Sequence, residues 1–417
     1  MEGGSGPPER RRRRLLVLGA GAAQLGLLEA ARALDLFVIA VDRDPAAPGF
    51  PLADRRAIIS TEDEPGIERL AEAERVNGVI APGIDWPVGV AARVAKRLSL
   101  AHPLTPEVAQ LTTSKVRQRE RFADVGVPQP RTELCKSLDE ARAAVERIGF
   151  PCVVKAPDRQ GQRGLALVRD ESSFVPAVDA ALEASRSNAC LVEELIDGQE
   201  VTVNAFSLDG RFYPLTVTDR VRAEPPAFGV ALAHVWPSAL SSAHVGAAVE
   251  AAREAAVALG IENGPTYTQV VVGLGGAKVV ELAARLGGGH DAELCEAALG
   301  VDLNELALAC ALGESIPRQV LAPLDPVGGA VTRFLTAPAG ELTAVEGVDE
   351  ATRMEGVIRV RIYRTPGWRF GELRVGSDRA GAVQAIGDTR DEALERAAAA
   401  AERIRFVTAD VDAKALA

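Results

Sequence analysis

Three side chains in the second half of the sequence are of the types that handle phosphate groups. Gln269 and Glu281 lie twelve positions apart on two expected strands, 267–272 and 278–282, and Arg285 follows in the same run. A tight hairpin can bring Gln269 and Glu281 to one face, because side chains alternate along a strand and pair across it. Oxygen ligands on one face suit Mg²⁺, and Arg285 could stabilise charge on a transferring phosphoryl group. A structural ion pair between Glu281 and Arg285 is the alternative.

A second group of residues could hold a triphosphate. Lys155 ends the apolar run CVVK, and a lysine in such a run is costly to bury unless it meets a negative partner. The loop 158–164 follows, and its Gly161 and Gly164 would let backbone N–H groups form an anion-binding nest. Lys115 could add a second positive charge. A surface hairpin with a snorkelling lysine fits the same residues equally well.

The segment LVEELIDGQE could hold the base and sugar of a nucleotide. Glu200 could accept hydrogen bonds from ribose hydroxyls, seven positions after the residues that would read an adenine edge with their main chain. Those residues are Glu193, Glu194, Leu195 and Ile196. A solvated acidic hairpin would have a similar composition, and it is the alternative for this segment.

A glycine motif near the N-terminus, GAGAAQLG, could bind an anion where a strand meets a helix. It contains Gly19, Gly21 and Gly26, and Asp42 ends the next strand, where a ribose-binding acid would lie. Gln24 takes the place of the third glycine of GxGxxG, which weakens the match to a nicotinamide-binding domain. Three interpretations stand: glycines for a tight turn, the wall of a pocket for another substrate, or a dinucleotide site.

The elements expected around these residues begin with a parallel sheet. Residues 1–14, which end in the run Arg10–Arg14, are expected to be a disordered, solvated leader, with an anion-binding patch as the alternative. Residues 15–104 alternate short apolar strands with helices, the pattern of a parallel, Rossmann-like sheet. The strands are expected at 15–19, 37–41, 54–60 and 78–81, and the helices at 23–34 and 64–75.

Two further units follow along the chain. Residues 105–316 begin with helix over 105–125, and hairpin turns are expected at Asp197–Gly198 and at 273–277. The first strands of this unit are expected at 152–155, 165–168, 189–193 and 200–206. Residues 317–417 are expected to be an α+β end domain, with strands at 328–335, 357–364 and 382–386 and a helix over 390–405.

Composition limits the kinds of partner. The 417 residues carry 47 Lys and Arg against 58 Asp and Glu, and aromatics are only 4%, which argues against a nucleic-acid binder. No apolar run has the length of a membrane span, and the N-terminus lacks the order of a secretory signal. The five cysteines form no CxxC pair, which argues against a zinc site and favours a reducing cytoplasm.

Taken in order, these segments resemble the ATP-grasp superfamily over nearly the whole chain. The N-terminal stretch from GAGAAQLG resembles the preATP-grasp domain of carboxyaminoimidazole-ribonucleotide synthetases, and SKVRQRERFADVGVPQP resembles the family's lysine helix. VVKAPDRQGQRGLALV resembles its phosphate-clamping strand and glycine loop, and LVEELIDGQEVTV its adenine and ribose hinge. The tail resembles the C-terminal domain of the biotin-carboxylase-like branch. The resemblance implies a mixed α/β and α+β chain: a preATP-grasp sheet, a two-subdomain ATP-grasp fold and a C-terminal α+β domain.

The resemblance also implies a role for each residue. Lys115, Lys155 and the glycine loop with Gly161 and Gly164 would contact ATP phosphates, and Glu193 to Ile196 and Glu200 would hold adenine and ribose. Gln269 and Glu281 would bind Mg²⁺ or Mn²⁺. Arg285, with Lys155, would stabilise an acyl phosphate and the tetrahedral intermediate that follows. Two positions differ from the commonest pattern: Gln269 replaces Glu, as in carbamoyl-phosphate synthetases, and Ala283 replaces a metal-binding Asn.

The implied activity is an ATP-dependent carboxylate–amine ligase of the amino-acid ligase type, acting on small molecules and forming a homodimer. An activator of bicarbonate or formate, as in purine biosynthesis, is the second hypothesis, and a non-catalytic nucleotide-binding module is the third. The acceptor pocket, expected to draw on 82–86, His234 and 285–291, would separate the first two. His234 and His290 are candidates for lining this pocket, and a purely structural role is the alternative for each. A nicotinamide-dependent dehydrogenase would leave residues 115–289 unexplained.

Overall fold

The computed structural model describes residues 12–409, so most of the predicted leader lies outside the described residues. The leader was expected to extend to residue 14, and for its last three residues this expectation is wrong. Arg14 begins the first strand and pairs with Glu74, while Arg12 contacts Asp54 at 2.8 Å. Arg12 and Arg14 are paired with carboxylates of the first unit, which fits neither a solvated leader nor its alternative, a patch that binds anions.

The first unit is the expected parallel sheet, with strand order β3-β2-β1-β4. Its strands are β1 (Arg14–Leu18), β2 (Phe37–Asp42), β3 (Arg55–Ile58) and β4 (Gly78–Ile80). They alternate with η1 (Ala22–Gln24), α1 (Leu25–Ala33), η2 (Phe50–Leu52), α2 (Glu64–Glu74) and α3 (Trp86–Arg97). The apolar run of β1 is buried on both sides, as a central strand of a covered parallel sheet requires.

Two capped helices connect this sheet to the rest of the chain. They are α4 (Pro106–Thr112) and α5 (Lys115–Val125). The Ser114 hydroxyl accepts a hydrogen bond from the Arg117 N–H, and Gly126 ends α5 in a left-handed conformation. This cap fixes the start of α5 at Lys115, so the lysine stands on the first turn of the helix.

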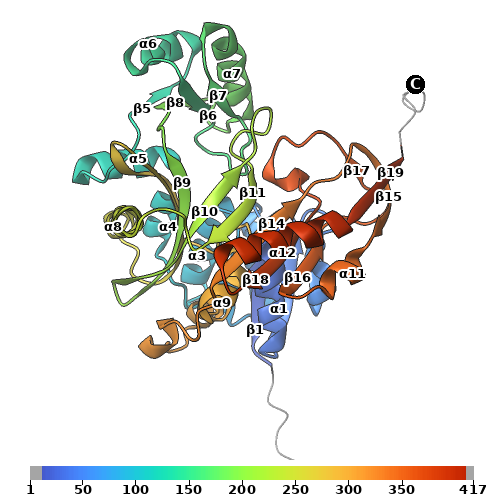
Figure 1. The fold of residues 1–417 in the computed structure, drawn as a ribbon. Helices are drawn as coiled ribbons and strands as arrows, with labels where there is room; N and C mark the ends of the chain where they lie inside the picture. The colour runs from blue at the N-terminus through green and yellow to red at the C-terminus, as the bar shows by residue number, and fades with distance from the viewer. Residues whose placement is uncertain (1–11, 410–417) are drawn as a thin grey trace, which may run out of the picture.

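A small antiparallel sheet forms a separate layer at the top of Figure 1, with strand order β5-β8-β6-β7. Its strands are β5 (Thr132–Cys135), β6 (Cys152–Lys155), β7 (Leu165–Val168) and β8 (Cys190–Glu194). Two helices cover one face: α6 (Leu138–Ile148) and α7 (Glu171–Ala184). The glycine loop 158–164 joins β6 to β7 and leaves the sheet toward the body of the protein.

The largest sheet has eight strands in the order β13-β12-β9-β10-β11-β14-β18-β16. Its strands are β9 (Gln199–Leu208), β10 (Arg211–Arg222), β11 (Ala231–Trp236), β12 (Gly264–Gly273), β13 (Gly276–Ala283), β14 (Gly329–Leu335), β16 (Val357–Ile362) and β18 (Gly381–Gly387). Helices around it are α8 (Ser242–Ala258), α9 (Asp291–Leu299), α10 (Leu303–Leu312) and α12 (Arg390–Arg403), with η3 (Arg318–Leu321) and η4 (Gly376–Asp378) between elements. The hairpin expected around 273–277 is present as β12–β13.

Two expectations about this region are corrected. Asp197–Gly198 is not a hairpin turn, because β8 belongs to the small sheet and β9 to the large one. The strands expected in a separate end domain, β14, β16 and β18, continue the same sheet as β9 to β13. Only a small outer sheet stands apart at the right of Figure 1: β15 (Gly340–Glu346), β17 (Arg369–Phe370) and β19 (Arg405–Ala409), beside α11 (Val348–Thr352).

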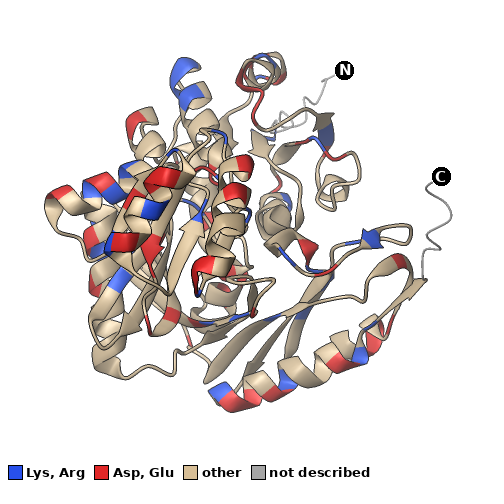
Figure 2. Cartoon of the chain, turned by 90° about the horizontal axis from the view of Figure 1, so that it is seen from above, with Lys and Arg blue, Asp and Glu red and all other residues tan. Residues whose placement is uncertain are grey.

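The surface carries charges of both signs. Figure 2 shows Lys and Arg interleaved with Asp and Glu along the outer helices, rather than gathered by sign. Within residues 12–409, none of the helices combines the length and the apolar character needed to cross a bilayer.

Candidate active site

A cavity of about 730 Å³ lies between the first sheet, the small antiparallel sheet and the large sheet. The first sheet, the small sheet with its glycine loop, the large sheet and the segment 363–379 all contribute to its wall. Eleven of the twelve residues expected to bind nucleotide or metal or to act in catalysis line it: Lys115, Lys155, Gly161, Glu193, Glu194, Leu195, Ile196, Glu200, Gln269, Glu281 and Arg285. Gly164 is the exception, since it turns the loop back against Ala156 and Ala184.

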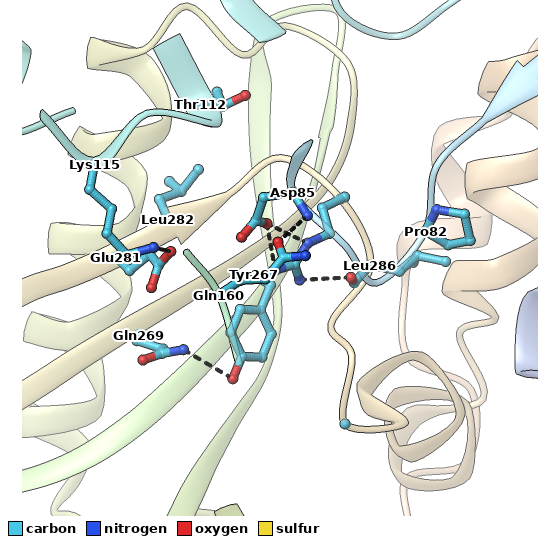
Figure 3. Close-up of polar contacts among 12 residues, drawn as sticks. Pro82, Asp85, Thr112, Lys115, Gln160, Tyr267, Gln269, Glu281, Leu282 and Leu286 are labelled. Atoms are coloured by element: carbon cyan, nitrogen blue, oxygen red, sulfur yellow. Dashed lines mark hydrogen bonds and ion pairs between the residues drawn. The ribbon is translucent and has the colours of Figure 1, made fainter. Parts of the chain in front are cut away.

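Gln269 and Glu281 face each other across the β12–β13 hairpin, as the spacing predicts. Lys115 reaches the same place from α5, and its Nζ lies 2.7 Å from Glu281 Oε1 (Figure 3). Burial alone would raise the pKa of Glu281, but the ammonium groups of Lys115 and Lys155 hold it below its usual range. Gln269 and Glu281 therefore offer one amide oxygen and one carboxylate on a single face of the hairpin.

These two oxygen donors fit Mg²⁺ with ligands shared between protein and phosphate. In the described part of the chain there is no group of three or more His, Cys, Asp or Glu side chains that could hold a metal by itself. Mg²⁺ usually takes one or two protein oxygens and completes its shell with water and substrate phosphates. Gln269 and Glu281 match that demand, and Ala283 adds no further donor.

Arg285 is fixed by Asp85, a residue 200 positions away in the sequence. Its Nε and Nη2 lie 2.7 and 2.6 Å from Asp85 Oδ1, and its Nη1 donates to the Leu286 carbonyl at 2.9 Å. The main-chain N–H of Asp85 donates to Gln160 Oε1 at 2.7 Å (Figure 3). Asp85 therefore connects Arg285 to the glycine loop, and the guanidinium is held in the wall of the cavity.

Lys155 meets a buried carboxylate, the partner that its apolar surroundings demand. Its Nζ lies 2.6 Å from Glu193 Oε2, while Arg119 Nε lies 2.9 Å from Glu193 Oε1. Lys155 is 6% exposed and Glu193 2% exposed, so a snorkelling surface lysine and a solvated acidic hairpin are both wrong here. Burial would raise the pKa of Glu193, but Arg119 and Lys155 outweigh it and lower the pKa to about 2.

Glu200 is engaged by two arginines of the neighbouring strand β10. Arg220 Nε lies 3.0 Å from Oε1, and Arg222 Nη1 lies 2.9 Å from Oε2. Arg220 also donates to the Tyr267 hydroxyl at 2.8 Å, which joins the Glu200 end of the cavity to its centre. Glu200 thus lines the cavity with its charge balanced by Arg220 and Arg222.

The glycine loop crosses the cavity and touches both opposite walls. Besides the contact from Asp85, the Gly161 carbonyl accepts a hydrogen bond from the Gly376 N–H at 3.3 Å. Behind the loop, Arg186 pairs with Glu62 of the first unit and lies over the Trp86 ring at 4.2 Å. The loop is therefore held between the first unit and the C-terminal segment that contains Gly376.

The N-terminal glycine motif and the expected acceptor segments form the far wall. Gly21, Gln24 and Asp42 line the cavity, and Gln24 Nε2 donates to the Pro82 carbonyl at 2.6 Å. From the expected acceptor segments, the lining residues are Gly83, Ile84, Asp85, His234, Arg285, Gly288 and Gly289. His290 does not line it; its ring is buried against Glu293 and the Tyr363 hydroxyl.

Sequence reasoning missed several lining residues from the C-terminal part of the chain. Tyr363, Arg364, Trp368 and Arg379 complete the wall beside η4. Arg364 lies 3.8 Å over the Trp368 ring and Arg379 lies 3.7 Å over the Phe334 ring. No local motif marks these residues, because they reach the cavity only through the pairing of β16 and β18 with the large sheet.

Two family profiles and a curated relative match this chain. The profile of the carbamoyl-phosphate synthase L chain ATP-binding domain matches residues 114–319, and that of L-amino acid ligase C-terminal domain 2 matches 333–409. A formate-dependent phosphoribosylglycinamide formyltransferase of Burkholderia pseudomallei (strain 668) is 30% identical over 424 aligned positions, which cover 95% of this chain and 96% of the relative.

Solved structures show the same fold at lower identity. An L-amino acid ligase from Bacillus licheniformis superposes with a TM-score of 0.82 at 21% identity, covering 96% of this chain and all (100%) of that one. An N5-carboxyaminoimidazole ribonucleotide synthetase from Thermotoga maritima has a TM-score of 0.70 at 20% identity. The superposition covers 95% of this chain and 100% of that one.

The chain belongs to the ATP-grasp superfamily, in its carboxylate–amine ligase group. It is an ATP-binding enzyme that forms C–N bonds with release of ADP. The expected fold and enzyme class are thereby confirmed, and a non-catalytic binding module is not what this chain is.

Proposed function

We propose that the enzyme is an amino-acid ligase, which joins the carboxylate of one amino acid to the amine of another. The observation that carries this proposal is the C-terminal wall of the cavity. Residues 333–409 match the C-terminal domain of L-amino acid ligases, and this segment supplies Tyr363, Arg364, Trp368 and Arg379 to the wall that contacts the glycine loop at Gly376. The substrate that lies there would be recognised by these side chains.

The proposed nucleotide site follows the expected roles. Lys115, Lys155 and Gly161 would contact the phosphates of ATP, with Gly164 shaping the loop, and Glu200 would face the ribose. Glu193, Glu194, Leu195 and Ile196 would hold adenine with their main chain, since the Glu193 carboxylate is already engaged by Lys155. Gln269 and Glu281 would hold Mg²⁺ (or Mn²⁺), which when bound neutralises phosphate charge and orients the γ-phosphate.

In the first step, the substrate carboxylate attacks the γ-phosphorus. An oxygen–phosphorus bond forms to the carboxylate, the bond to the β-phosphate oxygen breaks, and ADP leaves. Arg285 and Lys155 would stabilise the charge that spreads over the transferring group, because both are held in place before the reaction. The glycine loop would exclude water, which would otherwise hydrolyse the acyl phosphate. An amine then displaces phosphate.

A matrix of acids and amines tests this function. With MgATP, release of ADP and phosphate is measured for pooled amino acids on both axes, with formate and bicarbonate in separate wells. Release that requires two amino-acid pools supports the proposal. Release with formate or bicarbonate would favour the second hypothesis, an enzyme that activates one of these small acids. The similarity to the Burkholderia formyltransferase supports that hypothesis.

Arg285→Lys is expected to lower kcat by about 100-fold with little change in KM for MgATP. Lysine keeps the charge but loses the two nitrogens that bind Asp85 Oδ1, so the cation is no longer aimed at the reacting group. Steady-state ADP release measures both constants. Arg253→Lys, at an exposed pair with Glu250, is the control and should change neither. An unchanged kcat with a raised KM would assign Arg285 to binding only.

The proposed function also carries expectations about the assembly state and the cellular compartment. We expect small-molecule substrates and a homodimer, as in the biotin carboxylase domain dimer of Hydrogenobacter thermophilus, which has a TM-score of 0.77 to this chain at 18% identity. Light scattering of the purified protein measures the assembly state. The five free thiols support a reducing, cytoplasmic location.

A further inference from the structure

A buried histidine and a buried aspartate meet at the wall of the cavity. His234 on β11 is 1% exposed and Asp291, the first residue of α9, is 0% exposed. His234 Nδ1 lies 3.4 Å from Asp291 Oδ1, and neither atom has a hydrogen-bond partner within the described residues. The other carboxylate oxygen of Asp291 accepts from the Gly289 N–H at 3.1 Å. Within the described residues, the imidazole is the group that lies beside Asp291 Oδ1 and could donate a hydrogen bond to it.

This contact assigns the tautomer of the histidine. A carboxylate oxygen accepts hydrogen bonds only, so the ring proton belongs on Nδ1, and Nε2 keeps its lone pair. Nε2 faces Gly289, where an added Cβ would lie 2.9 Å from it. Burial lowers the pKa of His234 to about 4 although Asp291 raises it, so the ring is neutral at physiological pH. The Phe334 ring, edge-on at 5.8 Å, limits rotation of the imidazole.

The histidine lines the same cavity as Arg285, beside which the acyl phosphate would form. The Arg285 guanidinium lies 5.6 Å from the Tyr267 ring. A Cβ on Gly287 would meet both that ring and the Asp291 carboxylate, at 2.7 and 2.1 Å. Arg285, Tyr267 and His234 therefore line one cavity, and Asp291 lies behind its wall, where Gly287 permits the close approach of the backbone.

We infer that His234 accepts the proton that the amine loses when it attacks the acyl phosphate, with Asp291 orienting the ring. This inference rests on the proposed amide-forming function. In this step the nitrogen–carbon bond forms, the bond from the carbonyl carbon to the phosphate oxygen breaks, and inorganic phosphate leaves. One amine proton passes to Nε2, and Asp291 stabilises the resulting imidazolium until the proton passes to solvent. The preceding step needs no such base, because the attacking carboxylate is already ionised.

A comparison of two nucleophiles on one variant tests this role. An amine acceptor and hydroxylamine are supplied separately with MgATP and the same carboxylate, and amide and hydroxamate are measured. Hydroxylamine is unprotonated at neutral pH and gives its proton readily to water, so it depends little on a base. His234→Gln is expected to lower amide formation by about 100-fold and to change hydroxamate formation by no more than about threefold.

Asp291→Asn is expected to give the same pattern for a different reason. The amide would donate to Nδ1 and move the ring proton to Nε2, which removes the acceptor from the cavity side. His102→Gln is the matched control, since burial also lowers the pKa of His102 to about 4 and its ring does not line this cavity. Its ratio of amide to hydroxamate should equal that of the wild type.

Three outcomes would overturn the inference. Equal losses of amide and hydroxamate in His234→Gln would assign the residue to packing, and no loss of either would exclude any role in the step. Wild-type enzyme that forms no hydroxamate with any carboxylate would overturn the acyl-phosphate chemistry itself. That last result is a failure of the proposed function and is visible before any variant is made.

Discussion

Glu281→Gln is expected to lower ADP release by about 1,000-fold at saturating MgATP, the loss of several kcal/mol of charge stabilisation. Glu281 is the only carboxylate of the proposed metal pair, since its partner across the hairpin is Gln269. The variant would leave two neutral amides there, and it would also remove the anion that lies 2.7 Å from the Lys115 ammonium. Both the metal and the lysine would lose their fixed positions. Coupled measurement of ADP release gives the effect.

The opposite change at the other ligand sharpens this test. Gln269→Glu adds a second carboxylate to the same face and should lower the Mg²⁺ concentration for half-maximal ADP release. Glu250→Gln, at an exposed pair on α8, should leave activity as it is. Full ADP release by Glu281→Gln would show that catalysis does not use this hairpin, and the metal site would have to be sought elsewhere.

Glu193→Gln is expected to lower the free energy of unfolding by about 3 kcal/mol at neutral pH. The carboxylate lies between two buried cations, Lys155 at 2.6 Å and Arg119 at 2.9 Å. Gln keeps the shape and one hydrogen-bond acceptor, but it leaves both cations without a counter-charge. Thermal unfolding followed by calorimetry measures the loss. Glu194→Gln, whose partners Arg131 and Lys278 are more exposed, should lose less than about 1 kcal/mol.

The difference in unfolding free energy between the wild type and Glu193→Gln is expected to depend on pH. The pKa of Glu193 is lowered to about 2 in the folded protein, so its contribution to stability is present in full above the pKa of the unfolded chain. The contribution is lost as the pH falls from about 5 toward 2, because protonation then removes the same charge that Gln removes. The stability gap between wild type and Glu193→Gln should therefore close in acid. A gap that stays constant over this range would contradict the electrostatic origin of the effect.

Sequence reasoning predicted the features that depend on neighbouring residues. The buried runs of β1 and β2 and the hairpin that pairs Gln269 with Glu281 all follow from local periodicity and turn composition. The hairpin predicted at Asp197–Gly198 is wrong because β8 and β9 enter different sheets. Glycine after aspartate has the same local sequence whether the two flanking strands pair with each other or not. Strands β15, β17 and β19 carry no comparable pattern, and they were not expected.

What could not be predicted depends on contacts between distant segments. Nothing near Arg285 indicates that Asp85 will hold it, and nothing near Glu193 indicates Arg119 as well as Lys155. The pairing of β11 with β14, which joins the C-terminal strands to the large sheet, is likewise decided by packing across the whole fold. The roles assigned to these residues in binding and catalysis remain predictions for the experiments above.

The shared eight-stranded sheet constrains how this enzyme could be recombined with its relatives. A chimaera joined near residue 317 would take β11 from one parent and β14 from the other. These two strands are hydrogen-bonded neighbours, paired from Ala233 with Arg333 to Trp236 with Ala330. A mismatched ladder would expose unpaired strand edges, which promote aggregation. The segment 363–379 lies between β16 and β18 and carries most of the C-terminal wall of the cavity. Grafting this segment alone would exchange the wall while leaving the sheet that bears it intact.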